Sequence, residues 1–291
     1  MLRFAAIGLD HRHIYDQVEQ LQREGAVCVG HCPRTSDPRV LDGFRERFPN
    51  VPAVERRRLL EEPSIDFVCI AAVPGDRAAL AIDAMRLGKD VMVDKPGVTT
   101  LEDLAALQAC VADTGRIFSI CFSERFIVPA VELATQLVAQ GEIGRVVQTT
   151  GLGPHRLNRA IRPSWFFDPR RYGGILVDIA SHQIDQFLHF TGSDDAHVVS
   201  SGVANFALPD VPMFEDYGEL LLHGNAGASS ASTGSRPTAC RPGVMGAWFC
   251  WAPKASSSCA STSTSPVARA PTTCSSAIAP GRATSTRPAC R

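Results

Sequence analysis

The 291-residue chain carries 29 basic and 30 acidic residues, so its charge is nearly balanced and offers no basic field for binding nucleic acid. Its longest apolar run, residues 67–73, is too short to cross a bilayer. The first residues enter a strand-like pattern without the positive charge and cleavable apolar stretch of a leader. We therefore expect a cytoplasmic protein that binds neither nucleic acid nor a membrane.

The composition changes near residue 225. Residues 226–291 contain no Asp, Glu or Leu, but they hold five of the ten Cys together with six Arg and one Lys. Such a segment cannot bury enough apolar surface to offset the entropy lost on ordering, so a disordered tail is expected. A natural Ser/Thr/Pro-rich stalk is one interpretation. The other is a GC-rich gene read out of frame from a point between Gly224 and Ser230.

Residues 1–122 alternate strand-like and helix-like segments, which is typical of a parallel α/β sheet. Asp37 followed by Pro38 has the pattern of a helix N-cap and first helical residue, and Thr100 with Asp103 resembles a capping box. The expected strands are 3–7, 26–32, 65–73, 90–94 and 117–121. The expected helices are 13–24, 37–48, 76–87 and 100–114.

The pattern changes after residue 122. Helices are expected at 131–140 and 178–190. Strands are expected at 145–152, 197–205 and 217–223, with an irregular segment rich in Arg and aromatic residues at 153–172. The chain thus predicts an α/β fold: a nucleotide-type parallel-sheet domain at 1–122, followed by an α+β domain at 123–225.

The turn after the first strand lies where a doubly wound fold receives a cofactor pyrophosphate. Gly8 keeps the first glycine of the G-x-G-x-x-G pattern, whereas Asp10 and His13 replace the other two. Asp10 would repel a pyrophosphate unless its carboxylate caps the helix or points away, and an ordinary capped turn explains the segment equally well. The candidate cofactor contacts here are Gly8, Leu9, Asp10, His11, Arg12 and His13.

The end of the second strand bears on the choice between NAD and NADP. An NAD site generally places an acidic residue here to bind the ribose 2′-hydroxyl, and none occurs before Asp37. Arg34 with Thr35 and Ser36 would suit a 2′-phosphate, which slightly favours NADP over NAD. An exposed arginine in a surface loop is the plainer alternative.

Lys95 follows the fourth strand at the sheet edge where ligands of open α/β folds bind. The following proline keeps this lysine extended, although a surface lysine would need no function. The candidate cofactor contacts at this edge are Val73, Pro74, Asp94, Lys95 and Pro96.

A third group of residues begins at Gly173 and Gly174 and continues into a predicted helix. Asp178 and His182 are four residues apart, so an α-helix would place both side chains on one face. Histidine can act as a base near neutral pH, and a neighbouring carboxylate would orient it and adjust its pKa. A single helical histidine is more often structural, but this spacing favours a catalytic pair.

Together these segments resemble the glucose–fructose oxidoreductase and inositol dehydrogenase (Gfo/Idh/MocA) family. Residues 94–96 resemble its Glu-Lys-Pro motif, and residues 173–185 resemble its Gly-Gly-x-x-x-Asp-x-x-x-His-x-x-Asp helix. The resemblance spans residues 1 to about 224 of this chain. It implies an N-terminal Rossmann domain and a second domain whose open, mainly antiparallel sheet carries homo-oligomer contacts. It also implies a nicotinamide cofactor and a sugar or polyol substrate.

By the same resemblance, Lys95, Asp178 and His182 are the catalytic residues. The expected reaction is reversible hydride transfer: His182 removes the hydroxyl proton, Lys95 polarises the oxygen, and Asp178 fixes the imidazole. No metal is expected. The candidate substrate contacts are His155, Arg156, Arg162, Trp165 and Asp185.

The sequence is also compatible with two other functions. A non-catalytic nucleotide-binding or scaffold protein is favoured if Asp10 blocks the cofactor. The spacing of His11 and His13 resembles the metal-binding opening of amidohydrolase barrels, which need eight strand–helix units and further histidine ligands. Residues 1–225 offer only about five or six such units.

Overall fold

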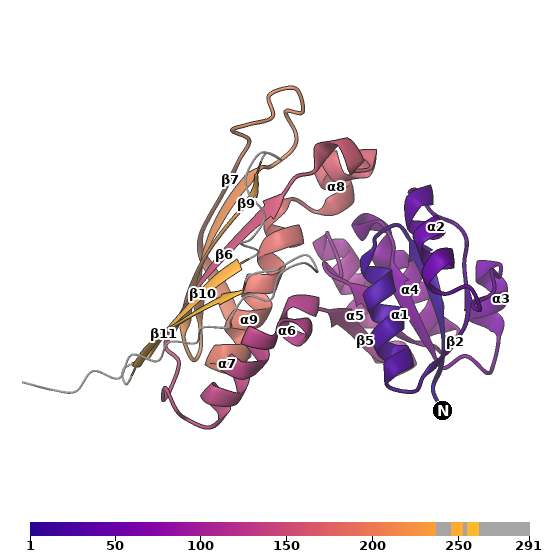
Figure 1. Cartoon of the computed structure of the whole chain (residues 1–291), viewed down its shortest axis with the longest axis horizontal. Helices are drawn as coiled ribbons and strands as arrows, with labels where there is room; N and C mark the ends of the chain where they lie inside the picture. Colours follow the sequence, from indigo (N-terminus) through magenta and orange to yellow (C-terminus); the bar gives the residue numbers. More distant parts are fainter. Residues whose placement is uncertain (237–245, 253–254, 262–291) are drawn as a thin grey trace, which may run out of the picture.

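The computed structural model describes residues 1–236, 246–252 and 255–261, and it consists of two units, each built on one sheet (Figure 1). The first sheet is parallel and has the order β2-β1-β3-β4-β5. Its strands are β1 (Arg3–Leu9), β2 (Val27–His31), β3 (Phe67–Ala71), β4 (Asp90–Asp94) and β5 (Phe118–Cys121). An open sheet of five strands is not an eight-stranded barrel, so the amidohydrolase alternative is wrong.

Helices cover both faces of the first sheet because successive side chains of a strand point to opposite sides. Phe4 and Ala6 of β1 pack with α1 and α2, while Ala5 and Ile7 pack with α3, α4 and α5. The helices are α1 (His13–Arg23), α2 (Pro38–Arg47), α3 (Arg56–Glu61), α4 (Arg77–Arg86) and α5 (Leu101–Thr114). The predicted parallel α/β domain is therefore confirmed.

Local helix signals act as the sequence predicts. The Asp37 side chain accepts a hydrogen bond from the backbone N–H of Arg39, and the Thr100 side chain accepts one from Asp103. The short helix α3 is an addition that the sequence pattern does not predict. It begins where Glu55 accepts hydrogen bonds from two backbone N–H groups of its first turn.

The second sheet is mixed and mainly antiparallel, with the order β11-β10-β6-β9-β8-β7 and one parallel pair, β6 with β9. Its strands are β6 (Gln148–Arg156), β7 (Ala196–Ala204), β8 (Tyr217–Gly224), β9 (Ala228–Arg236), β10 (Gly246–Ala252) and β11 (Ala255–Ser261). The helices are α6 (Ser123–Ile127), α7 (Pro129–Ala139), α8 (Pro169–Tyr172) and α9 (Ser181–Thr191).

Helices α6, α7 and α9 lie on the side of the second sheet that is turned toward the first unit (Figure 1). Phe187 of α9 packs against Leu220 and Leu222 of β8 and Ala231 of β9, which form a small apolar core. Among the described residues, no helix has the length and apolar character needed to span a bilayer.

The structure corrects two predictions in the second unit. Strand β6 runs on to Arg156, so residues 153–156 are not irregular. The segment for which composition predicts disorder contains β9, β10 and β11, so that prediction is wrong for these strands; the remaining residues after 236 lie outside the described part of the chain. Composition does not predict β9 because some of its buried side chains are polar. Ser229 and Thr233 are buried, and their hydroxyls form hydrogen bonds with β6.

Candidate active site

Lys95 joins the two units at the carboxyl end of the first sheet. Its Nζ lies 2.8 Å from Asp178 Oδ1 and 2.8 Å from the Asp178 backbone oxygen. Both side chains are largely buried, at 7% and 14% exposed. Burial opposes ionisation of Asp178, but the Lys95 ammonium outweighs it and holds the pKa of Asp178 below its ordinary value. A charged pair is therefore held at the junction between the two units.

Asp178 does not contact His182, so the predicted pairing of carboxylate and imidazole is wrong. The predicted helix begins with a π-helical turn, Leu176–Ala180, before continuing as α9. A π-turn closes hydrogen bonds five residues apart and is wider than an α-turn, so the side-chain directions expected for a regular α-helix do not hold for this segment. Asp178 turns to Lys95, while His182 Nδ1 is buried without a hydrogen-bond partner.

His182 faces a carboxylate that the sequence analysis missed. Glu124 follows β5 on α6, and its Oε1 lies 3.9 Å from His182 Nε2 and 3.9 Å from His155 Nε2. Burial raises the pKa of Glu124 to about 7, although Lys95 and His13 lower it in part. Lys95 is predicted as a site residue because it follows a strand of the parallel sheet. Glu124 also follows such a strand, so the same rule could have identified it.

The imidazole of His182 is neutral near pH 7. Burial lowers its pKa well below the ordinary value, and the Lys95 ammonium lowers it further. A neutral imidazole has a lone pair on one nitrogen and can accept a proton there. Lys95, Asp178, His182, Glu124 and His155 thus gather into one polar group that contains a fixed cation and a neutral base.

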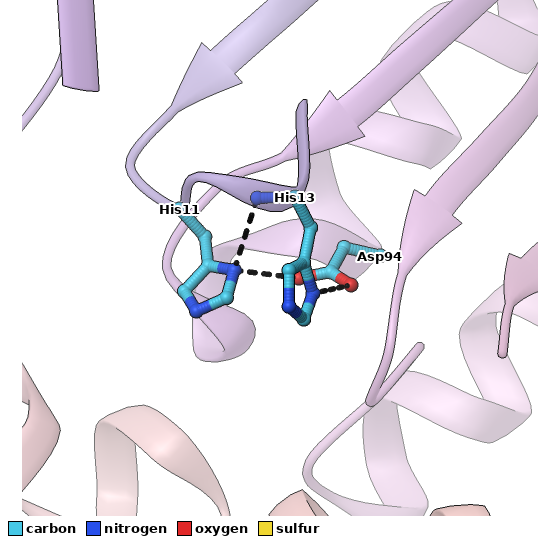
Figure 2. A group of neighbouring side chains, drawn as sticks. All are labelled: His11, His13 and Asp94. Carbon is cyan, nitrogen blue, oxygen red and sulfur yellow. Dashed lines mark hydrogen bonds and ion pairs between the residues drawn. The ribbon is translucent and has the colours of Figure 1, made fainter. Parts of the chain in front are cut away.

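Asp94 anchors the neighbouring turn between β1 and α1 (Figure 2). Its Oδ1 lies 2.8 Å from His13 Nδ1, and its Oδ2 lies 3.3 Å from His11 Nδ1 and 3.0 Å from an Arg77 nitrogen. Burial would raise the pKa of Asp94, but His13 and Arg77 hold it well below the ordinary value. Arg77 is itself buried and also donates to the backbone oxygens of Ala72, Asp94 and Pro96.

His11, His13 and Asp94 offer three donor atoms that lie within 4.8 Å of one another, a spacing that a metal ion could use. Two imidazoles and a carboxylate suit zinc or iron. However, Arg77 shares the carboxylate, and its fixed positive charge opposes a second cation there. We interpret the group as an ion-pair cluster that holds the turn against the end of β4.

We expect Asp94→Asn to lower the free energy of unfolding by about 3–5 kcal/mol, because it leaves the buried Arg77 guanidinium without its counter-ion. Urea unfolding followed by circular dichroism measures this. The matched control is Asp83→Asn on α4, where the side chain is exposed and the stability should hardly change. Equal stability of the two variants would show that the backbone oxygens alone satisfy Arg77.

The turn between β1 and α1 has the features that a dinucleotide needs. Gly8 has φ +63°, and a Cβ there would lie 2.6 Å from Ala72 Cβ, so only glycine fits. Asp10 accepts hydrogen bonds from Ser36 N at 2.5 Å and Ser36 Oγ at 2.7 Å, and from Thr35 Oγ1 at 3.3 Å. Its carboxylate therefore points to the loop after β2. At the start of α1, the backbone N–H of His13 donates to His11 Nδ1 at 3.4 Å (Figure 2).

The other predicted site residues are placed as follows. Leu9, Val73 and Pro74 are buried at the sheet edge, whereas Arg12 and Arg34 are exposed. The Lys95–Pro96 peptide is cis. Their roles as cofactor contacts stay predictions.

The candidate substrate contacts do not all lie together at one site, as the sequence suggests they would. His155 is near Glu124, but Arg156 is exposed at the end of β6. Asp185 pairs with Arg125 at 2.8 Å. Arg162 donates to the Leu157 backbone oxygen, and Trp165 packs with Phe166 in an aromatic cluster. Of this set, His155 lies 3.9 Å from Glu124 and so joins the polar group around His182.

Comparison with known proteins places both units in one family. The model of the oxidoreductase family with an NAD-binding Rossmann fold matches residues 11–122, and the model of the Gfo/Idh/MocA C-terminal domain matches residues 131–243. A crystal structure from Erwinia carotovora atroseptica SCRI1043, described as an oxidoreductase, superposes with a TM-score of 0.84. It is 43% identical, with 89% of this chain and 78% of that chain covered.

Two relatives of known name are more distant. The NAD-dependent scyllo-inositol 2-dehydrogenase of Bacillus subtilis is 28% identical over 227 residues, which is 75% of this chain and 61% of the relative. Levoglucosan dehydrogenase of Pseudarthrobacter phenanthrenivorans is 31% identical over 160 residues, or 54% of this chain and 40% of the relative. The chain thus spans less than two thirds of either relative. With both domain types matched in order, this chain belongs to the Gfo/Idh/MocA family of oxidoreductases.

Proposed function

We propose that the protein is a nicotinamide-dependent dehydrogenase that oxidises a CH–OH group of a sugar, a polyol or a related small molecule. The observation that carries this proposal is the buried Lys95–Asp178 pair, which places an ammonium beside the neutral imidazole of His182. It lies at the carboxyl end of the parallel sheet, where open α/β folds bind their ligands. Relatives named as inositol and levoglucosan dehydrogenases support the substrate class.

A nicotinamide dinucleotide, when bound, supplies a hydride acceptor. The turn at Gly8 and the residues after β3 and β4 would hold it. In the oxidation, His182 accepts the hydroxyl proton at Nε2, the nitrogen that faces the polar group. The Lys95 ammonium stabilises the negative charge that develops on the substrate oxygen. Asp178 keeps this ammonium in place with two acceptor atoms, one from its side chain and one from its backbone.

Nicotinamide fluorescence titration, followed by an activity screen, tests the proposal. We expect the protein to bind NAD or NADP and to reduce the cofactor with a member of a panel of inositols, anhydrosugars and pentoses. Binding without turnover on any of them would favour a nucleotide-binding scaffold. Absence of cofactor binding would contradict the dehydrogenase and would favour a non-catalytic scaffold protein.

The choice of cofactor depends on Asp10. The residues Arg34, Thr35 and Ser36 by themselves slightly favour NADP, and this preference is untested. However, the carboxylate of Asp10 accepts hydrogen bonds from both hydroxyl residues of this loop, and its negative charge opposes a 2′-phosphate. We therefore propose NAD as the preferred cofactor of this chain.

Replacing Asp10 by asparagine should raise the affinity for NADP relative to NAD by about 5- to 10-fold, since one nearby negative charge is removed. Dissociation constants for both cofactors, measured by fluorescence titration, give this ratio. Asp42→Asn on α2 is the control, because this exposed side chain lies outside the turn. An unchanged ratio would contradict the role of Asp10.

We further propose that the protein forms a homo-oligomer in the cytoplasm. Val198 and Val203 are about half exposed on β7, which lies at the edge of the second sheet, and the family resemblance places oligomer contacts on this sheet.

The cysteines among residues 1–225 are free thiols, as expected in a reducing compartment. Light scattering after size exclusion would contradict the oligomer if it gave the mass of one chain.

We also propose that the coding sequence changes frame shortly after Gly224. The composition after residue 225 supports this, since acidic residues and Leu both end there. Resequencing the gene from independent isolates tests it. The same uninterrupted frame in every isolate would overturn the proposal.

A further inference from the structure

Glu124 is a buried acidic group that the reaction as described above does not use. Its side chain is 15% exposed, and its Oε1 lies at the same distance, 3.9 Å, from the Nε2 atoms of His155 and His182. These two histidines come from β6 and α9, and Glu124 comes from α6. A gap of 3.9 Å is too long for a direct hydrogen bond, but one bridging water or a small side-chain movement closes it.

We propose that Glu124 is a positioning residue beside Nε2 of His182 that takes the substrate proton from this atom and passes it through His155 toward solvent. This inference rests on the proposed dehydrogenase function. Asp178, the carboxylate expected to serve His182, is bound to Lys95 instead. Among the described residues, Glu124 is therefore the carboxylate that lies within 4 Å of a His182 ring nitrogen.

The proton balance of this step is complete. In the oxidation, the substrate O–H bond breaks and its proton goes to His182 Nε2, while the C–H hydride leaves with its electron pair for the nicotinamide and C=O forms. The proton then moves from His182 to the Glu124 carboxylate and on to His155. The side chain of His155 is 21% exposed, against 3% for His182, so His155 offers the outward path.

The electrostatic setting supports this role. The groups that face Glu124 are His155, His182, the Lys95 ammonium after β4 and His13 at the start of α1. Burial brings the pKa of Glu124 to about 7, so the carboxyl group can both accept and release a proton near neutral pH. Below that pH the carboxyl is already protonated and cannot take the proton from His182. We therefore expect turnover in the oxidation to rise with pH through about 7.

The test compares Glu124→Gln with the wild-type protein. The amide has the same shape but cannot accept the proton as a carboxylate does, so turnover should fall about 10- to 100-fold while KM and cofactor affinity change little. The rise in turnover near pH 7 should disappear. Glu124→Asp retains a carboxylate, so it should recover part of the activity together with the pH step. Glu142→Gln, at an exposed position, is the matched control and should behave like the wild type.

A second readout does not depend on turnover. The imidazole NMR signals of His155 and His182, assigned with single His→Ala variants, should both report a titration step near pH 7 that Glu124→Gln removes. The inference would be overturned if the wild-type protein showed no titration step near pH 7. It would also be overturned if Glu124→Gln kept the turnover and pH profile of the wild type. If the wild type binds cofactor but oxidises no substrate, the dehydrogenase proposal fails, and the NMR titration still decides whether Glu124 is coupled to the histidines.

Discussion

The Lys95→Met variant is expected to lose about 100- to 1000-fold in turnover, because it lacks the ammonium proposed to stabilise charge on the substrate oxygen. Lys95 Nζ donates hydrogen bonds to two atoms of Asp178, which hold the ammonium in place. Steady-state kinetics with the best substrate of the screen measures the effect. Cofactor affinity should change much less than turnover.

The same variant should also become sensitive to pH. In the wild-type protein, Lys95 outweighs burial and holds the pKa of Asp178 low, so the charged form is stabilised above the ordinary carboxyl pKa. Without Lys95, burial is opposed only by the weaker effects of His11 and His155, so this pKa rises. The variant should therefore lose stability relative to the wild type as pH rises from about 5 to 8. Thermal unfolding at both pH values measures the difference.

A control variant that removes another positive charge shows whether the effects are specific to Lys95 or follow from any loss of charge. Arg86→Met removes an exposed cation from the last turn of α4, and both activity and pH dependence should stay at the wild-type level. Lys95→Met with normal turnover would mean that the ammonium takes no part in the reaction. Lys95→Arg keeps the charge but changes its geometry, so it should recover stability more than activity.

The His182→Ala variant should turn over at least about 100-fold more slowly, since a positioned base contributes about that much or more. Cofactor binding should be unchanged, because His182 lies on α9 and the proposed cofactor contacts lie on the first unit. Rapid-mixing kinetics and fluorescence titration measure the two properties separately. Normal turnover in this variant would exclude the role.

His189→Ala is the matched control for His182→Ala. His189 lies on the same helix, but its Nε2 contacts Thr135 of α7 rather than the polar group. Its loss should cost activity little. If both alanine variants lose activity equally, the cause is disturbance of α9 rather than loss of the base.

Several parts of the site could be predicted from the sequence because they depend on local chemistry. Lys95 was identified from its place after a strand and before a proline, and its burial at the sheet edge is as expected. Asp178 and His182 were identified from their spacing, yet their predicted contact was wrong. The spacing argument assumes a regular α-helix, whereas Leu176–Ala180 form a π-turn and Asp178 pairs with Lys95 from the first unit.

Other parts of the site depend on residues that are distant in the chain. Asp94 gains its partners from α4 and from the β1–α1 turn, and Asp10 binds a loop about 25 residues further along the chain. Glu124 has no local motif, and its raised pKa comes from the burial that α6, α9 and β6 create together. Contacts between residues so far apart in the chain cannot be predicted from any short segment of the sequence.

What the sequence by itself determined is the alternation of strands and helices, the glycine at the first turn and the two segments that carry Lys95, Asp178 and His182. These follow from local periodicity, turn geometry and residue chemistry, all of which are present in short stretches of chain. Only the tertiary structure decided which carboxylate lies next to which cation or imidazole. Partner choice and pKa depend on distance and burial, and both arise only when the two units come together.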